Sequence, residues 1–236
     1  MVLEQRSDVP WGFADFTLVI LCGYLSAIAV TLLATFGGLE AGPTIVIGAV
    51  AMASGLALGC VAVTRRRSAS LADLGFVVEP SDGLYLLGGV GLQLALAIAF
   101  APIAEFVQSD GPTQVVANEI SGITALGSRI AIVLSVGLLT PIAEELTFRG
   151  VLLHATRRRL DDRGAQIVTA AIFSVLHWLG IEGGNTWAGL VTLAQLFIVG
   201  WILARVTVRT RRLGPAIFMH AGFNTLTLLT LFFPTA

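Results

Sequence analysis

The sequence has no lysine, two cysteines and few charged residues of any kind. All 14 basic residues are arginine, and charged residues make up only 12% of the chain, whereas water-soluble domains carry about 25%. Cys22 and Cys60 both fall inside apolar runs and match neither a disulfide framework nor a metal-ligand spacing. The low charge excludes an ordinary soluble domain, and the scarcity of cysteine excludes a disulfide scaffold.

Long apolar segments make up most of the sequence. Hydrophobic residues make up 56% of the 236 residues, and the mean hydropathy is +0.87. Because a membrane span needs about 20 apolar residues, the sequence predicts an all-α, polytopic membrane bundle that forms one transmembrane domain over residues 1–236. Seven spans are expected, at 14–36, 43–64, 83–105, 129–158, 164–181, 187–206 and 214–233. The first is read as a retained span because it is too long for a signal peptide, and the loop at 106–128 has room for a short interfacial helix.

The arginines predict how these spans are oriented. If seven spans alternate, 12 of the 14 arginines fall on one side of the membrane, and the positive-inside rule makes that side cytoplasmic. We therefore expect a multi-pass protein of the plasma membrane with its N-terminus in the cytoplasm and its C-terminus outside. The 12 are Arg6, Arg65, Arg66, Arg67, Arg157, Arg158, Arg159, Arg163, Arg205, Arg209, Arg211 and Arg212.

The fourth span contains two adjacent carboxylates. Apolar sequence runs from Arg129 to Arg159, which is about 45 Å of helix, so Glu144 and Glu145 lie near mid-membrane. A charge at that depth costs several kcal/mol on insertion scales, and it marks a functional site by default.

The spacing of the charged residues predicts different roles for the two carboxylates. Glu145 and Arg149 are four residues apart, so they share a helix face and can form an ion pair, while Glu144 points about 100° away and stays free for chemistry. Pro141 cannot donate a hydrogen bond to the carbonyl of Gly137, so a kink is expected beside the pair.

Polar residues of two later spans are expected at a similar depth. Measured from the nearest basic cluster, Glu144, His177 and Asn224 lie about 20, 21 and 18 Å along their helices, and His220 lies one turn before Asn224 on the same face. Each has a structural alternative, namely a hydrogen-bonded packing histidine or an interhelical asparagine, and their coincidence in depth favours a site. His154 is expected on the opposite helix face from Glu145 and outside the site.

At these residues the chain resembles the family of CAAX prenyl endopeptidases and bacteriocin-processing intramembrane proteases. The pattern of that family is Glu-Glu-x-x-x-Arg, then Phe-x-x-x-His, then His-x-x-x-Asn or a similar last residue. It is found here, in order, as "EELTFR" (Glu144, Glu145, Arg149), "FSVLH" (Phe173, His177) and "HAGFN" (His220, Asn224). The resemblance covers roughly residues 129–230, the motif-bearing core of the bundle, and the family's best-understood members have eight helices, so seven or eight are expected.

The resemblance implies peptide hydrolysis inside the bilayer. Glu144 is expected to act as general base on a water that His177 helps to polarise, with His220 and Asn224 as hydrogen-bond donors to the oxyanion and Arg149 orienting Glu145. A zinc alternative stays open, in which Glu144, His177 and His220 hold the metal and the second glutamate is the base. Apart from that zinc ion, no cofactor is implied.

Two other functions use the same residues. A non-catalytic membrane scaffold or immunity protein would keep the fold, and a proton-coupled transporter also places acids and histidines in its spans, although no repeated halves are found here. The expected partners are the lipid bilayer and a membrane-associated, leader or CAAX-like peptide substrate, with no nucleic acid. The sequence does not choose among these substrates or fix the oligomeric state.

Overall fold

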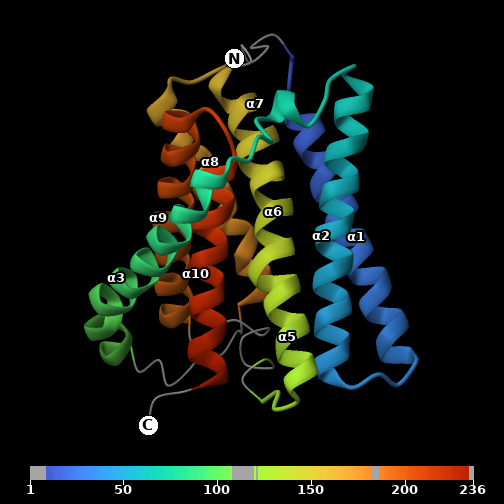
Figure 1. The fold of residues 1–236 in the computed structure, drawn as a ribbon, viewed down its shortest axis with the longest axis vertical. Helices are drawn as coiled ribbons and strands as arrows, with labels where there is room; N and C mark the ends of the chain where they lie inside the picture. Colours follow the sequence, from blue (N-terminus) through green and yellow to red (C-terminus); the bar gives the residue numbers. More distant parts are fainter. Residues whose placement is uncertain (1–8, 108–119, 121, 182–185, 234–236) are drawn as a thin grey trace.

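The fold is known from a computed structural model, which describes residues 9–107, 120, 122–181 and 186–233. Its regular elements are all helices, which confirms the predicted all-α membrane bundle (Figure 1). In chain order they are α1 (Phe13–Phe36), α2 (Ala41–Arg66), η1 (Ala72–Leu74), η2 (Pro80–Leu84), α3 (Tyr85–Phe106), α5 (Leu126–Leu134), η3 (Ser135–Leu139), α6 (Thr140–Glu145), η4 (Leu146–Leu152), α7 (Leu153–Arg157), α8 (Asp162–Leu176), η5 (His177–Gly180), α9 (Thr186–Thr210) and α10 (Gly214–Phe232).

Six helices of the described residues are long and apolar enough to cross a membrane. They correspond to six of the predicted spans, and the segment from α5 to α7 forms one of them, Leu126–Arg157. The remaining prediction, the span at 164–181, corresponds to α8, whose 15 residues reach only about 22 Å, short of the ~30 Å hydrocarbon core. The chain then tightens into the 3₁₀ turn η5. The interfacial helix expected in the loop at 106–128 falls mostly on residues outside the described ones.

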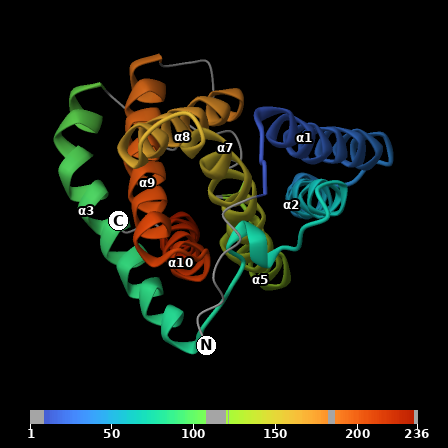
Figure 2. The ribbon, with the colours of Figure 1, turned by 90° about the horizontal axis from the view of Figure 1, so that it is seen from above.

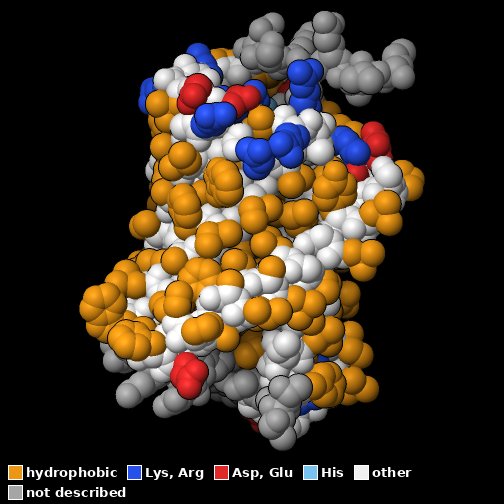
Figure 3. All heavy atoms as spheres, turned by 90° about the vertical axis from the view of Figure 1, so that its left-hand side faces the viewer, with side chains coloured by type: hydrophobic (Ala, Val, Ile, Leu, Met, Phe, Trp, Pro, Cys, Tyr) orange, Lys and Arg blue, Asp and Glu red, His pale blue; other side chains and the backbone are white. Residues whose placement is uncertain are grey.

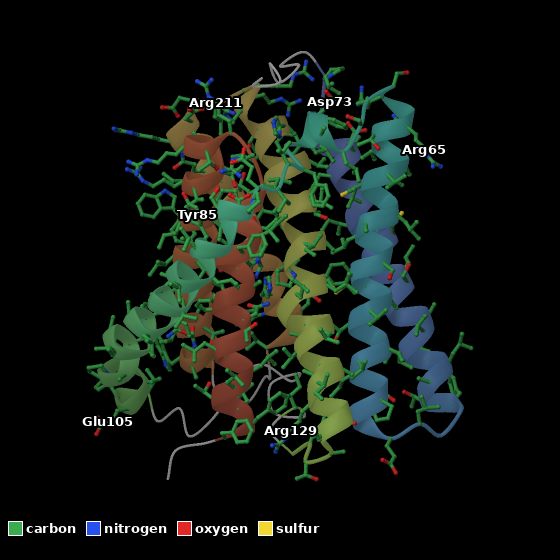
Figure 4. The ribbon with its side chains drawn as sticks, viewed as in Figure 1. Arg65, Asp73, Tyr85, Glu105, Arg129 and Arg211 are labelled. Atoms are coloured by element: carbon green, nitrogen blue, oxygen red, sulfur yellow. The ribbon has the colours of Figure 1, made fainter. Side chains whose placement is uncertain are left out.

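Charged side chains gather at the two ends of the bundle. Arg65, Asp73 and Arg211 lie at one end, whereas Glu105 and Arg129 lie at the other (Figure 4). A broad apolar band separates the charged end from the opposite one, as the space-filling view of one face shows (Figure 3). The chain is therefore a multi-pass membrane protein with one basic end. That this end faces the cytoplasm remains a prediction from the positive-inside rule.

The helices form two groups on either side of a central rod. α1 and α2 pack against each other on one side, α3, α9 and α10 lie on the other, and the rod from α5 to α7 stands between them (Figure 2). The largest buried apolar cluster joins these parts near the middle of the rod and includes Phe16, Leu56, Phe148 and Phe173. Residues 143–153 of the rod are thus buried by the surrounding helices, which allows this part of the rod to carry polar groups.

Polar contacts fasten the loops at the basic end. The buried Asp15 at the start of α1 pairs with Arg67 at 2.7 Å, and the buried Asp82 of η2 pairs with Arg212 just before α10. Because each pair joins segments far apart in the sequence, the helices enter the membrane from a fixed framework.

Helices α3 and α10 approach each other through glycine. A Cβ at Gly89 would collide with the carbonyl of Met219, and a Cβ at Gly222 would collide with the carbonyl of Leu86. Small residues allow such close backbone contact, and dispersion contacts of this kind drive helix association in lipid. Gly91, on the same helix, has open space where its Cβ would be.

This contrast generates a stability prediction. We expect Gly89→Ala to lower the free energy of unfolding by about 1–3 kcal/mol, because the added methyl group overpacks a backbone contact. Gly91→Ala is the matched control and should leave stability unchanged or slightly higher, since it only adds helix propensity. Thermal unfolding of both variants in detergent measures the difference, and equal midpoints would contradict the close α3–α10 packing.

Candidate active site

The two glutamates stand between two widened turns of the central rod. Ser135–Leu139 and Leu146–Leu152 are π-helical, and α6, which ends with Glu144 and Glu145, lies between them. The first widened turn lies where the sequence predicted a kink, just before Pro141. The second had no sequence signal that we recognised. Single π turns inside α-helices are rare and occur often at functional sites.

The first widened turn follows from the missing N–H of Pro141. In a π turn the carbonyl of Val136 would accept a hydrogen bond from the fifth residue onward, which is Pro141 and has no N–H. The side-chain amide of Asn224 donates to this carbonyl instead, at 3.0 Å. Asn224 was expected to face the reacting carbonyl. In the structure, one N–H group of the Asn224 side chain is used in this hydrogen bond, which links α10 to the rod.

The expected ion pair is present and completely buried. Arg149 Nη1 donates to Glu145 Oε1 at 2.8 Å, and both side chains have no exposed surface. Arg149 Nη2 donates to the Gly200 carbonyl at 3.0 Å, and the guanidinium carbon lies 4.7 Å from the ring centre of Phe173. At Gly200 a Cβ would press on Ala170 and Phe173, so the glycine lets α9 come close enough to hold the arginine.

His220 links the two carboxylates. Its Nδ1 lies 2.8 Å from Glu145 Oε1, and its Nε2 lies 3.6 Å from Glu144 Oε2. The histidine itself is 4% exposed. Because a carboxylate only accepts hydrogen bonds, Nδ1 carries a proton, and Nε2 is directed towards Glu144. Sequence spacing placed Glu145 with Arg149, but it did not show that Glu145 also holds the histidine.

Glu144 has fewer polar contacts than Glu145. It is 7% exposed, and it makes no hydrogen bond to any residue that the structure describes, the contact with His220 being longer than one. Close by, Glu145 Oε2 and Arg149 Nε are buried without a hydrogen-bond partner. Buried polar atoms are seldom left without partners, and this concentration indicates a site that is completed by water or by a ligand.

His177 lies beside this cluster and does not touch it directly. It is the first residue of η5, its Nδ1 lies 2.7 Å from the Phe173 carbonyl, and its ring centre lies 4.6 Å from that of Phe173. The Phe173 ring in turn lies 6.0 Å from that of His220. The predicted packing role of Phe173 is therefore a central one, since its ring contacts both histidines and Arg149. The Nε2 of His177 makes no hydrogen bond to any residue that the structure describes.

The zinc alternative requires three ligands at one point. Within the described part of the chain, no three His, Cys, Asp or Glu side chains come together closely enough to hold a metal ion. Glu144 and His220 are neighbours, but the structure does not add His177 to them. The residues as arranged do not fit the group, and we derive no step through a metal. His154 binds the carbonyl of Gly150 on its own helix at 2.6 Å and stays outside the site, as expected.

The first helix contributes a residue that sequence analysis missed. The Tyr24 hydroxyl donates to the carbonyl of Leu176 at 3.4 Å, and the phenol is close enough to interact electrostatically with Glu144. Leu176 is the last residue of α8, whose final carbonyls have no partner within the helix, and the next residue is His177. Tyr24 belongs to no recognised motif, although it is one of only two tyrosines and lies within a span.

Comparison with known proteins gives a family match over the region that carries the motifs. Residues 126–226 match the family model described as type II CAAX prenyl endopeptidase Rce1-like, which confirms the resemblance over that region. The chain is also similar to an uncharacterised 24.3 kDa protein of Escherichia coli, with 32% identity over 103 residues that cover 42% of this chain and 44% of that protein. No solved structure matches the chain significantly. The Rce1-like family is one of intramembrane proteases, and the match begins after α3.

The burial of the ion pair generates a second stability prediction. Arg149→Met should lower the free energy of unfolding by about 3–5 kcal/mol, because it leaves the carboxylate of Glu145 buried without its cation. The double variant Glu145→Gln/Arg149→Met should regain part of the loss, since no buried charge is then left unpaired. Arg163→Met, at an exposed position, is the control. Thermal unfolding in detergent checks the order, and a double variant less stable than Arg149→Met alone would contradict the pairing.

Proposed function

We propose that this protein is an intramembrane endopeptidase that hydrolyses a peptide bond of a membrane-associated or leader-like substrate, with Glu144 as the general base. One observation carries the proposal. The Glu144 carboxylate is free of hydrogen bonds to the described residues and lies 3.6 Å from a histidine nitrogen, and that histidine is held by a second, neutralised carboxylate. A base, an acid and an orienting group thus stand in one buried cluster.

Charge balance suggests the resting state of this cluster. Two carboxylates and one guanidinium carry a net charge of −1, and an unbalanced charge is costly inside a membrane protein. One further proton makes the cluster neutral, and the Glu144–His220 pair is where it can be held, because Glu145 is already bound to Arg149. We place this proton on His220, which leaves Glu144 ionised as a base.

The reaction then follows from these positions. Glu144 takes a proton from water, and the resulting hydroxide adds to the carbonyl carbon of the scissile bond. His220 Nε2, the remaining N–H of Asn224 and Nε2 of His177 are the groups available to stabilise the oxyanion. When the carbon–nitrogen bond breaks, the leaving nitrogen takes the proton that Glu144 accepted. Arg149 acts on the geometry only, by fixing Glu145 and through it His220.

We further propose the cellular setting. The basic end faces the cytoplasm of a cell whose plasma membrane the protein crosses, and the substrate reaches the cluster as a peptide anchored in or lying on that membrane. This peptide is CAAX-like or leader-like. A non-catalytic scaffold and a proton-coupled transporter remain the alternatives that the first experiment separates.

That experiment compares the N-terminal proteomes of cells that express the wild type or Glu144→Gln at matched levels. We expect termini that are present with the wild type and absent with the variant, because loss of a general base costs about 10²–10⁴-fold in rate. Glu105→Gln, at the opposite end from Arg65 and Arg211 (Figure 4), is the matched control and should retain the termini. Identical termini in all three strains, with the Glu144→Gln protein folded, would contradict proteolysis and favour a scaffold or transporter.

A finer prediction concerns Tyr24. We expect Tyr24→Phe to reduce the rate of cleavage at those termini by roughly 2- to 12-fold, the equivalent of one hydrogen bond, because the end of α8 next to His177 loses its donor. Tyr85→Phe, which removes the hydroxyl of the chain's other tyrosine at the start of α3, should have no effect. A rate assay on a peptide that spans one identified terminus measures both variants, and equal rates would remove Tyr24 from the site.

A further inference from the structure

A cavity opens at the basic end of the molecule, away from the acidic cluster. Its volume is about 160 Å³, and it lies between the start of α1 and the end of α7. Its lining consists of Trp11, Gly12, Phe13, Ala155, Arg158 and Arg159. The wall is therefore aromatic on the α1 side and cationic on the α7 side, and none of these residues has a role in the proposed reaction.

Both arginines of the cavity are held in place without a carboxylate. Arg158 Nη1 donates to the Trp11 carbonyl at 3.3 Å, and the Arg159 guanidinium carbon lies 4.9 Å from the ring centre of Phe13. No described carboxylate pairs with either of them. By contrast, the adjacent Arg157 pairs with Asp162.

The carboxylate at the start of α1 does not neutralise the cavity either. Asp15 is completely buried, accepts from the N–H of Gly12 at 2.9 Å and pairs with Arg67 at 2.7 Å. Among the described residues, the two positive charges of the cavity are thus oriented by neutral groups. Guanidinium groups with free N–H donors match the geometry of phosphate oxygens.

The position of the cavity identifies the source of the phosphate. Phe13 begins the first membrane span, so the cavity lies where that span meets the basic end of the bundle, at the level expected for lipid headgroups. Basic pockets between helices on the cytoplasmic side are a known setting for anionic headgroups. We propose that this cavity binds the phosphate of an anionic phospholipid, with Arg158 and Arg159 as ligands and the acyl chains along the apolar flank of α1.

Such a lipid would connect two parts of the molecule. α1 carries Tyr24, and α7 continues directly from the turn that contains Arg149. A phosphate bound by Arg158 and Arg159 beside Trp11 and Phe13 adds a bridge between the first helix and the rod at the basic end. This inference concerns lipid binding alone and does not depend on the proposed peptidase activity.

The test uses the full-length protein purified in neutral detergent. Phosphatidylglycerol is titrated into the wild type, into Arg158→Gln/Arg159→Gln and into Arg163→Gln, and retained lipid is counted by native mass spectrometry. With about 1 kcal/mol for each arginine near an anionic lipid, we expect the double variant to bind roughly 30-fold more weakly. Arg163→Gln, which removes an exposed arginine at the same end but outside the cavity, should bind as the wild type does.

Three further measurements decide the interpretation. Phosphatidylcholine should bind the wild type and the double variant equally, and circular dichroism should show that the double variant is folded. Inorganic phosphate competing at low millimolar concentration would support the phosphate site but assign it to a soluble ligand. Equal losses in the double variant and in Arg163→Gln would overturn the proposal, because the attraction would then come from the surface charge as a whole.

Discussion

The structure depends on keeping one carboxylate charged inside a membrane. Glu145 is completely buried and is held by Arg149 on its own helix and by His220 on another. Each of these partners needs its own support, since Arg149 also uses the Gly200 carbonyl and the Phe173 ring. Helices α8, α9 and α10 thus each contribute one group that supports this ion pair. The adjacent Glu144 makes no hydrogen bond to a described residue, because Arg149 is bound to Glu145.

The widened turns on either side of the glutamates belong to the same arrangement. A π turn shifts the register of the residues that follow it. The span from Leu126 to Arg157 contains two such turns, so they change the side of the helix on which each later residue lies. The turn before Pro141 leaves the Val136 carbonyl without its donor, and Asn224 supplies one from α10. The motif asparagine thus has a structural task that residue spacing alone could not show, and this task fixes the distance between α10 and the acidic pair.

Much of the fold and part of the site could be predicted from the sequence. The membrane class, six of the spans and the gathering of arginines at one end came from composition and run length, which are local properties. The Glu145–Arg149 pair came from helical spacing. Features that depend on contacts between helices were not predicted. The end of α8 at Leu176, followed by the 3₁₀ turn η5, gives no signal in the apolar run of the predicted span at 164–181. Tyr24 was missed because its partner lies 152 residues away, and no periodicity encodes such a contact.

The family match covers residues 126–226, and yet the geometry of the site extends beyond them. Phe16 of α1 packs edge-on against Phe148 with ring centres 5.6 Å apart, and Phe148 packs in turn against Phe173, the ring that contacts both histidines. The Tyr24 hydroxyl reaches the end of α8 from the same helix. A chain truncated to the matched region would therefore keep every motif residue and lose the wall that excludes lipid from Phe148. The α1–α2 pair belongs to the site because a charged cluster in a membrane has to be shielded from lipid by protein.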